Sequence, residues 1–355
     1  MKRLLALCVC AALLFSGCGA AGKQAHISTA LTQRTPILID SDGNISDFYA
    51  LAYVNTCDKL DLRAITCSYG AVSLEQAGIN LLSSAELYGF SCPVALGARY
   101  PTSSFVIYNS QTDGKNGLGD VILPTPKKQF DSRPAWQVMY ETAKEEGGKL
   151  QIICMGPLTN VARAITEYPD FKDYVAGVTT TAGGGSVEDL ASDGTRLTGP
   201  VMPEQSDLLN DTGALETLTT SGIPVTLIGT YVSPGYFLGY SPEKGAENTL
   251  DVWLAPESTY SEYFLAVREH FKASGKFQDI AAFPSVMAIL SVIDPTLLTY
   301  SPLKSAVCRE STLEIMQMPM QDRDSSTIQI ATSISDLDQY DEMFMFMPIY
   351  YRAQE

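Results

Sequence analysis

Apolar runs and helically spaced apolar positions alternate along most of the chain. Runs with the length of buried strands occur at residues 37–39, 62–67, 93–96, 150–154, 175–181 and 224–229. Helical spacing is found at residues 47–57, 74–88, 158–165 and 211–220, with later helices expected around 257–273 and 283–293. This alternation predicts an α/β fold, a mostly parallel β-sheet flanked by helices. No internal repeat or low-complexity linker follows residue 35, so we expect a single domain at residues 36–355.

The first residues have the pattern of an export signal. Two basic residues precede an apolar run at residues 4–15, which is too short for a membrane span, since a span needs about 20 residues. The run closes in the sequence LFSGC, which resembles a bacterial lipobox and makes Cys18 the expected lipidation site. A plain signal peptide cut near Ala20 is the alternative. We therefore predict a lipoprotein-type signal peptide at residues 1–17, a tether at residues 18–35, and a lipid-anchored protein of the bacterial cell envelope.

Composition narrows the partners and the chemistry. Of 355 residues, 40 are Asp or Glu and 24 are Lys or Arg, which gives a formal net charge of −16. This acid excess argues against nucleic acid and against anionic membrane surfaces as partners, because both need clustered Lys and Arg. Membrane contact is expected through the lipid anchor only. The two histidines argue against a His-rich metal site and against a Ser-His or Cys-His triad.

The cysteines do not form a metal or redox motif. No CxxC occurs among the five that follow Cys18, so the spacing excludes zinc-ribbon and thioredoxin-like sites. Cys67 and Cys154 lie in strand-like apolar runs, and we expect them to be buried as small hydrophobic side chains.

Three aspartates stand at the end of the first predicted strand. Asp40, Asp42 and Asp47 fall within eight residues, and Gly43 allows a tight turn between strand and helix. Ligands of open parallel sheets bind at the carboxyl ends of the strands. Crowded carboxylates repel each other and a hard cation relieves that repulsion, so this cluster predicts a metal or catalytic site. Helix capping by Ser46 or Asp47 is the alternative interpretation.

The acidic segment resembles motifs of two enzyme families. ILIDSDGNISD (37–47) is similar to the first motif of haloacid-dehalogenase-type phosphatases, in which Asp40 would be the nucleophile and Asp42 the acid. It also resembles the DxDxGxDD signature of inosine–uridine-preferring nucleoside hydrolases. Three later segments resemble motifs of those hydrolases in the same order: DGKNGLGD (113–120), MGPLTNVARA (155–164) and ILSVIDPTLL (289–298). No late acidic pair of the phosphatase kind is seen, so the nucleoside hydrolase fold is expected.

The resemblance implies a Ca²⁺ site that holds the attacking water and the ribose hydroxyls of a small nucleoside-like ligand. By motif position, Asp42 would be a metal ligand and the general base, and Asp47 a second metal ligand. Thr159 would contribute its backbone carbonyl to the metal, and Asp40 would support the site from the strand. The implied reaction is attack of water on the anomeric carbon with departure of the nucleobase.

Several positions depart from the family pattern. Ser46 stands where the family has an aspartate, and Asp113 replaces a loop histidine. The sugar-binding Glu-Phe-Asn aligns with residues 205–207, which include Gln205 and Asp207, and a late His-Asp pair aligns with Pro284 and Ser285. Loss of the carboxylate at Ser285 predicts weaker Ca²⁺ binding. Ser46, Asp113, Gln205 and Asp207 are therefore candidates for contacts with a ligand that differs from an ordinary ribonucleoside.

The sequence leaves three functions open. The first is hydrolysis of N-glycosidic bonds in nucleosides or related N-ribosides. The second is a non-catalytic envelope lipoprotein that binds nucleosides or sugars on the same fold, and the third is the phosphatase. No acid for the leaving group is evident, since we expect His270 to be an exposed or capping residue of its helix. A homo-oligomer is compatible with the sequence.

Overall fold

The computed structural model describes most of the chain downstream of the predicted tether. The described residues are 34–102, 106, 113–183, 206–229, 261–274, 284–309, 314–319, 327–336, 339 and 343. The predicted signal peptide, Cys18, nearly all of the tether and Gln205 lie outside these residues, so the expectations for them remain predictions from the sequence. Among the described residues, no helix is long and apolar enough to cross a membrane.

The strands of the described part form one nine-stranded sheet. They are β1 (Thr35–Ser41), β2 (Leu60–Cys67), β3 (Val94–Leu96), β4 (Leu150–Met155), β5 (Val175–Gly183), β6 (Val225–Gly229), β7 (Leu298–Arg309), β8 (Glu314–Pro319) and β9 (Ile328–Ile334). Their order is β3-β2-β1-β4-β5-β6-β9-β7-β8. All pairs from β3 to β9 are parallel, and β7 pairs antiparallel with both β9 and β8. The predicted α/β fold with a mostly parallel sheet is confirmed.

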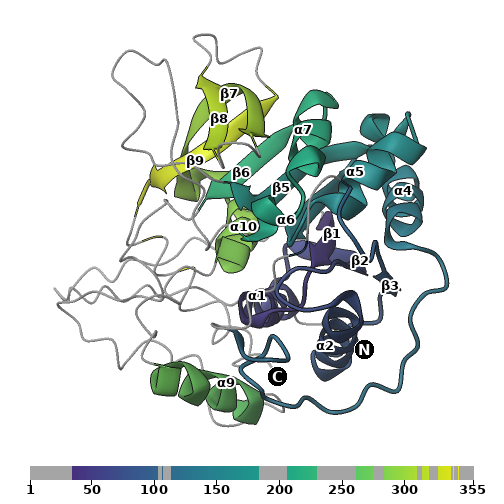
Figure 1. Cartoon of the computed structure of the whole chain (residues 1–355), viewed down its shortest axis with the longest axis vertical. Coiled ribbons are helices and arrows are strands. Elements are labelled where there is room, and N and C mark those ends of the chain that lie inside the picture. Colours follow the sequence, from purple (N-terminus) through teal and green to yellow (C-terminus); the bar gives the residue numbers. More distant parts are fainter. Residues whose placement is uncertain are drawn as a thin grey trace, which may run out of the picture. The chain divides into compact units, whose positions relative to one another are not determined.

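Helices pack on both faces of the sheet (Figure 1). They are α1 (Ile45–Thr56), α2 (Leu74–Leu87), α4 (Ala135–Glu146), α5 (Thr159–Glu167), α6 (Ser206–Asn210), α7 (Thr212–Thr220) and α10 (Pro284–Ile293). The described part also contains α9 (Ser261–Ser274), whose Val267 belongs to the first of the two cores described next. Buried side chains of α1, α2 and α10 form one hydrophobic core with the sheet, and those of α4, α5 and α7 form the other. The strand β1 lies between the two cores: Ile37 and Ile39 face the first and Leu38 faces the second. Burial on both faces explains why the central strands are continuous apolar runs.

The connection from β1 to α1 positions the acidic cluster. Gly43 takes a left-handed conformation with φ of 69°, and a Cβ there would lie only 2.9 Å from the carbonyl oxygen of Ala77. Asn44 caps α1, because its Oδ1 accepts a hydrogen bond of 3.1 Å from the backbone N–H of Asp47. The alternative that Ser46 or Asp47 caps this helix is therefore wrong, and the Asp47 side chain is available to the site.

Five helices and strands were not predicted from the sequence. These are the helices α4 and α6 and the strands β7, β8 and β9. The predicted helix at 211–220 begins at Thr212, after the short helix α6. The predicted burial of Cys67 and Cys154 is confirmed, since both are fully buried and unpaired.

Candidate functional site

The candidate residues gather where the parallel strands end. Asp42 directly follows β1, Ser68 follows β2, Thr159 begins the helix after β4, and Thr181 lies near the end of β5. These strands are neighbours in the sheet, so their carboxyl ends form one edge. Asp42, Ser68 and Thr159 are all at most 1% exposed. Polar side chains are seldom this deeply buried, and packing of the hydrophobic core does not require them at these positions.

Asp42 is held by one side chain and one backbone group. Its Oδ1 accepts a hydrogen bond of 2.9 Å from Nδ2 of Asn44, and its Oδ2 accepts one of 2.7 Å from the backbone N–H of Ala71. Glycine lies on two sides of the carboxylate: a Cβ on Gly70 would be 2.1 Å from Oδ2, and one on Gly156 would be 3.1 Å from the Asp42 Cβ. The Asp42 carboxylate therefore has little room to move.

Asp47 is surrounded by serine hydroxyls. Its Oδ2 accepts a hydrogen bond of 2.6 Å from Ser41, and its Oδ1 accepts one of 2.7 Å from Ser285 at the start of α10. The hydroxyl of Ser46 in turn donates to Ser285 at 2.5 Å. The predicted site residues Ser46 and Asp47 thus contact Ser285 through a chain of hydrogen bonds, although 238 residues separate Asp47 from Ser285 in sequence.

Asp40 lies beneath this pair and is fully buried. Its Oδ1 accepts hydrogen bonds of 2.7 Å from Thr66 and 2.9 Å from Nδ2 of Asn160. The Oδ1 of Asn160 accepts from the backbone N–H of Ala98 at 2.8 Å, which ties the segment after β3 to α5. Within the described part, Oδ2 of Asp40 and Oγ of Ser68 have no hydrogen-bond partner. Asp40 is thus joined to β2 and α5 by hydrogen bonds, and its supporting role remains a prediction from the sequence.

Thr159 is fixed by its side chain. Its hydroxyl donates to Oδ2 of Asp211 at 2.7 Å and lies 2.7 Å from the hydroxyl of Tyr69. Asp211 also accepts hydrogen bonds from the backbone and side chain of Thr102 and caps α7 through the N–H of Ala214. These contacts anchor the start of α5 at the site, so the position of the Thr159 backbone depends on Asp211.

The site carries an excess of negative charge. Burial, together with the charges of Asp207, Asp47 and Asp113, raises the pKa of Asp42 well above its usual range. Burial also raises the pKa of Asp47 to about 6, although hydrogen bonds from Ser41 and Ser285 oppose the shift. The pKa of Asp207 is raised to about 7 by burial and by the charge of Asp47. The predicted residues Asp113 and Asp207 therefore lie close enough to the cluster to act on it electrostatically.

Asp113 and Asp207 approach the cluster from two segments. Asp207 is partly buried in α6, where it accepts a hydrogen bond of 2.9 Å from Thr181. Asp113 begins the turn at residues 113–120, which is closed by a hydrogen bond of 2.6 Å from the N–H of Gly119 to the Asp113 carbonyl. The ring of His270 packs on this turn, since a Cβ on Gly119 would lie 2.8 Å from its Cδ2. His270 is thus partly buried against the turn and is not the exposed residue that was one expectation from the sequence.

The carboxylates fit a hard cation only in part. Asp42 and Asp47 would supply two negative ligands in a buried place where the charge of Asp47 raises the pKa of Asp42, and a cation would relieve that repulsion. Among the described residues, however, no three His, Cys, Asp or Glu side chains group closely enough to hold a metal ion. A cation here would need uncharged oxygens for its remaining ligands, as Ca²⁺ accepts.

Sequence reasoning missed several residues that shape the site. Ser41, Asn44, Asn160 and Tyr69 each hydrogen-bond a predicted site residue or its support. Three of them lie inside the motifs DSDGNISD and GPLTN, so their place in those motifs was the available signal. Ala71 carried no such signal, because it acts through its backbone N–H.

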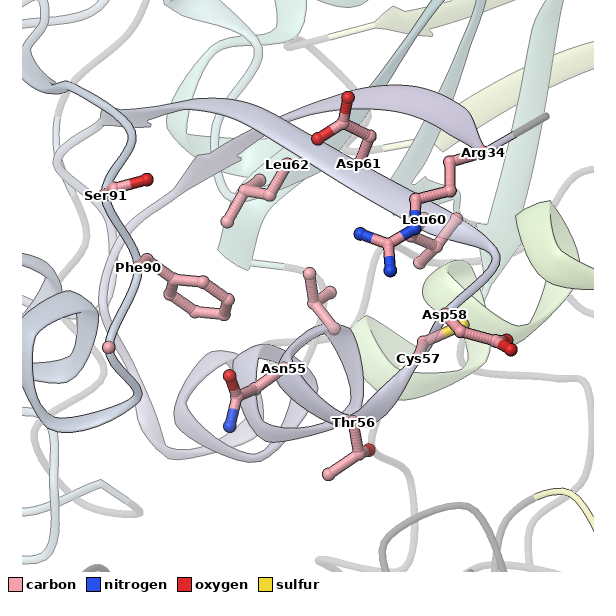
Figure 2. Close-up of a pocket in the computed structure, with 12 residues that line it drawn as sticks. Arg34, Asn55, Thr56, Cys57, Asp58, Leu60, Asp61, Leu62, Phe90 and Ser91 are labelled. Atoms are coloured by element: carbon pink, nitrogen blue, oxygen red, sulfur yellow. The ribbon is translucent and has the colours of Figure 1, made fainter. Parts of the chain in front are cut away.

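A separate pocket lies at the opposite end of the strands. It has a volume of about 390 Å³. It is lined by Arg34 just before β1, by the end of α1, by the start of β2 with Leu62, and by residues 89–91 after α2, including Phe90. Figure 2 shows the Arg34 guanidinium directed into this pocket, with Phe90 on the opposite wall. It contains none of the predicted site residues.

Comparison with known proteins gives one family over most of the chain. The model of the inosine-uridine preferring nucleoside hydrolase family matches residues 37–342. Uridine nucleosidase 1 of Arabidopsis thaliana is 30% identical over 217 residues, which are 60% of this chain and 62% of that protein. The pyrimidine-specific ribonucleoside hydrolase RihA of Salmonella typhimurium is 28% identical over 195 residues, or 55% of this chain and 60% of that protein. In both alignments the chain spans less than two thirds of the relative's length.

Solved structures share the fold. A purine-preferring ribonucleoside hydrolase from Gardnerella vaginalis superposes with a TM-score of 0.74 at 20% identity, covering 90% of this chain and all of that one. A plant nucleoside hydrolase superposes with a TM-score of 0.73 at 19% identity, covering 89% of this chain and 99% of that one. These structures show a shared fold, and the family match over residues 37–342 supports the nucleoside hydrolase resemblance over the phosphatase alternative.

Proposed function

Because the chain belongs to the inosine-uridine preferring nucleoside hydrolase family, we propose that it hydrolyses the N-glycosidic bond of ribonucleosides or related N-ribosides. One observation carries the proposal for this chain. Asp42 and Asp47, both buried at the carboxyl end of β1, are each oriented by hydrogen bonds to both carboxylate oxygens. Pre-oriented carboxylates are what a water-activating site needs.

Asp42 is the proposed general base. Its two hydrogen-bond donors leave further lone pairs on both oxygens, which can accept a proton from water. In the proposed step the water oxygen bonds to the anomeric carbon and the carbon–nitrogen bond breaks. Asp42 takes a proton from the water, while the nucleobase leaves with the electron pair and takes a proton from solvent.

The neighbouring carboxylates have a second role in this proposal. Positive charge develops on the sugar when the carbon–nitrogen bond breaks. Asp47 and Asp207 lie close enough to raise the pKa of Asp42, so the same charges favour the developing cation. This effect requires no motion of the protein during the reaction.

Ca²⁺ is the proposed metal ion. Asp42 and Asp47 would supply its charged ligands, and the backbone carbonyl of Thr159 and neutral oxygens would supply others. When bound, the ion lowers the pKa of the attacking water and offers contacts to sugar hydroxyls. The limited number of grouped carboxylates in the described part favours weak rather than tight binding.

Binding without turnover is the second candidate function. It is favoured by the contact between Ser46 and Ser285, because each hydroxyl is engaged by the protein where the family pattern has carboxylates. A ligand would then be held by Asp42, Asp113 and Asp207 without an activated water. Gln205 is a further proposed contact.

We also propose that the chain is exported and anchored to the bacterial cell envelope through a lipid on Cys18. The support is the apolar run followed by LFSGC. Radioactive palmitate should label the wild-type protein in bacteria, and Cys18→Ala should abolish the label. Export without labelling would favour the plain signal peptide.

Incubation of the purified chain with a panel of nucleosides tests the function. The panel contains uridine, inosine, and their deoxy and arabino analogues, each with Ca²⁺ and with EDTA, and chromatography measures free base and free sugar. Equal release of base and ribose without added phosphate supports hydrolysis. Binding measured by calorimetry without release supports the second candidate. Neither release nor binding by folded protein contradicts both.

A further inference from the structure

Asp47 accepts hydrogen bonds from the hydroxyls of two serines, and a third serine hydroxyl bonds one of these two. Ser41 at the end of β1 donates to Oδ2 at 2.6 Å, and Ser285 in the first turn of α10 donates to Oδ1 at 2.7 Å. Ser46 in α1 donates to Ser285 at 2.5 Å. Asp47 is fully buried and Ser285 is 2% exposed, whereas Ser46 is partly buried.

The proton directions in this network are fixed. A serine hydroxyl has one hydrogen, and Ser285 gives that hydrogen to Asp47. The oxygen of Ser285 must therefore accept from Ser46. Ser46 thus donates to Ser285, and Ser285 donates to Oδ1 of Asp47. This arrangement is favourable only if Oδ1 of Asp47 carries no proton. Removal of Ser285 leaves Oδ1 of Asp47 without this donor, and removal of Ser46 leaves the Ser285 oxygen without its donor.

The hydroxyls satisfy Asp47 by means other than a cation. A buried carboxylate is stabilised either by an ion or by hydrogen-bond donors. Here both oxygens of Asp47 have donors from the protein, and both donors are uncharged. Ser285 Oγ also lies so close to Asp47 Oδ1 that the two atoms can contact the same ion. The residue at position 285 thus determines whether a cation bound by Asp42 and Asp47 has a third carboxylate ligand or a neutral oxygen.

Resting on the function proposed above, we infer that Ser46 and Ser285 are positioning residues that pre-orient Asp47 in the ion-free protein and keep the affinity of the site for Ca²⁺ low. Fewer charged ligands give weaker Ca²⁺ binding, and sites of the weakest class have dissociation constants of about 10⁻⁴–10⁻³ M. The protein is then folded with its site in order when Ca²⁺ is absent. The ion binds reversibly as its concentration changes.

Ser285→Asp and Ser285→Asn form the matched pair that tests this inference. The two side chains have the same size, but only the aspartate adds a carboxylate next to Asp47. Calorimetric titration with CaCl₂ gives the affinity, and thermal unfolding in EDTA and in excess Ca²⁺ gives the stability. Both readouts are independent of turnover, so failure of nucleoside hydrolysis and failure of this inference are distinguishable.

The inference predicts weak Ca²⁺ binding by the wild type and a small change of its Tm between EDTA and Ca²⁺. Ser285→Asp should bind Ca²⁺ roughly tenfold more tightly or better, and its Tm should fall below that of the wild type in EDTA and recover in Ca²⁺. Ser285→Asn should show no gain in affinity. Ser46→Ala should lower the Tm in EDTA more than in Ca²⁺. In Ca²⁺ the bound ion holds Asp47 in place and partly compensates for the loss of the Ser46 hydroxyl.

Three results would overturn the inference. One is tight, micromolar Ca²⁺ binding by the wild type, with a large loss of Tm in EDTA. Another is equal affinity of folded Ser285→Asp and Ser285→Asn. The third is an equal loss of Tm by Ser46→Ala in EDTA and in Ca²⁺. If Ser285→Asp does not fold in either condition, the wild-type titration and the Tm shifts of Ser46→Ala test the inference.

Discussion

The backbone N–H of Ala71 donates a 2.7 Å hydrogen bond to Oδ2 of Asp42, and the residue before it is a glycine whose added Cβ would lie 2.1 Å from the same oxygen. The turn after β2 therefore holds the proposed base closely. Gly70→Ala should displace the Asp42 carboxylate and lower kcat/KM for the best nucleoside by about 10²-fold. Ala71→Gly keeps the N–H and is the matched control, with a much smaller effect expected. Steady-state kinetics and circular dichroism provide the measurement, and wild-type activity in Gly70→Ala would contradict this account of the turn.

Asn160 should be a stabilising residue of the site. Its amide donates to Asp40 and to the carbonyl of Cys67 and accepts from Ala98, all within the buried edge of the sheet. Asn160→Ala leaves several of these groups without a partner and should reduce the free energy of unfolding by roughly 3 kcal/mol. Urea unfolding measures the loss. Thr220→Ala, at an exposed position of α7, is the control and should change stability by less than about 0.5 kcal/mol.

The effect of Ca²⁺ on stability should grow with pH. Burial raises the pKa of Asp47 to about 6 and of Asp207 to about 7, so the ion-free folded state binds more protons than the unfolded state between the ordinary value of 3.8 and those values. The free energy of unfolding without Ca²⁺ should therefore fall as pH rises through this window. Ca²⁺ binds the deprotonated carboxylates, so the Tm gain from Ca²⁺ should be larger at about pH 8 than at about pH 5.

Thermal unfolding in EDTA and in Ca²⁺ at both pH values checks this dependence. Asp47→Asn removes one of the titrating groups and should reduce the difference between the two Tm gains. A Tm gain that is equal at both pH values in the wild type would contradict the assignment of these carboxylates to a cation site.

Asp211 should control the position of Thr159. Its carboxylate accepts from the Thr159 hydroxyl, from the N–H and hydroxyl of Thr102, and from the N–H of Ala214. Asp211→Ala removes a helix cap and these contacts, and should cost about 1–3 kcal/mol of stability. A loss of kcat/KM beyond that of Thr102→Ala, measured on folded protein, would show that the Thr159 contact matters for the reaction. Equal activity of the two variants would limit Asp211 to a structural role.

The sequence predicted the fold where hydrophobic burial decides local structure. The central strands are buried on both faces and therefore form continuous apolar runs, which is how β1, β2 and β4 were located. The helix α4 was missed because its buried positions, Ala135, Val138, Met139 and Ala143, are few and separated by polar residues, and no side chain caps its start. The last strands were missed because β7 contains Pro302 and several polar residues, so its pairing with β9 depends on distant contacts.

The site, like the fold, was predictable where neighbouring residues in the sequence form it and not where distant segments meet. Asp42 and Asp47 follow their strand closely in the sequence, so the local cluster and the family motif located them. The contact between Asp47 and Ser285 joins α1 to α10, and only the motif alignment placed Ser285 near the cluster. The support from Ala71 is a backbone contact, and the packing of His270 on Gly119 depends on the position of α9. Neither leaves a pattern in the sequence.

The release of nucleobase by the wild type and by Asp42→Asn tests the central claim most directly. Both proteins are incubated with uridine and inosine in the presence of Ca²⁺, and the free base and free ribose are measured by chromatography. The account predicts equal amounts of base and ribose from the wild type, and a rate that is about 10²–10⁴-fold lower in folded Asp42→Asn, because the general base is lost. Base release by Asp42→Asn at the wild-type rate would contradict the assignment of Asp42, and no release from any nucleoside by the folded wild type would contradict the proposed hydrolysis.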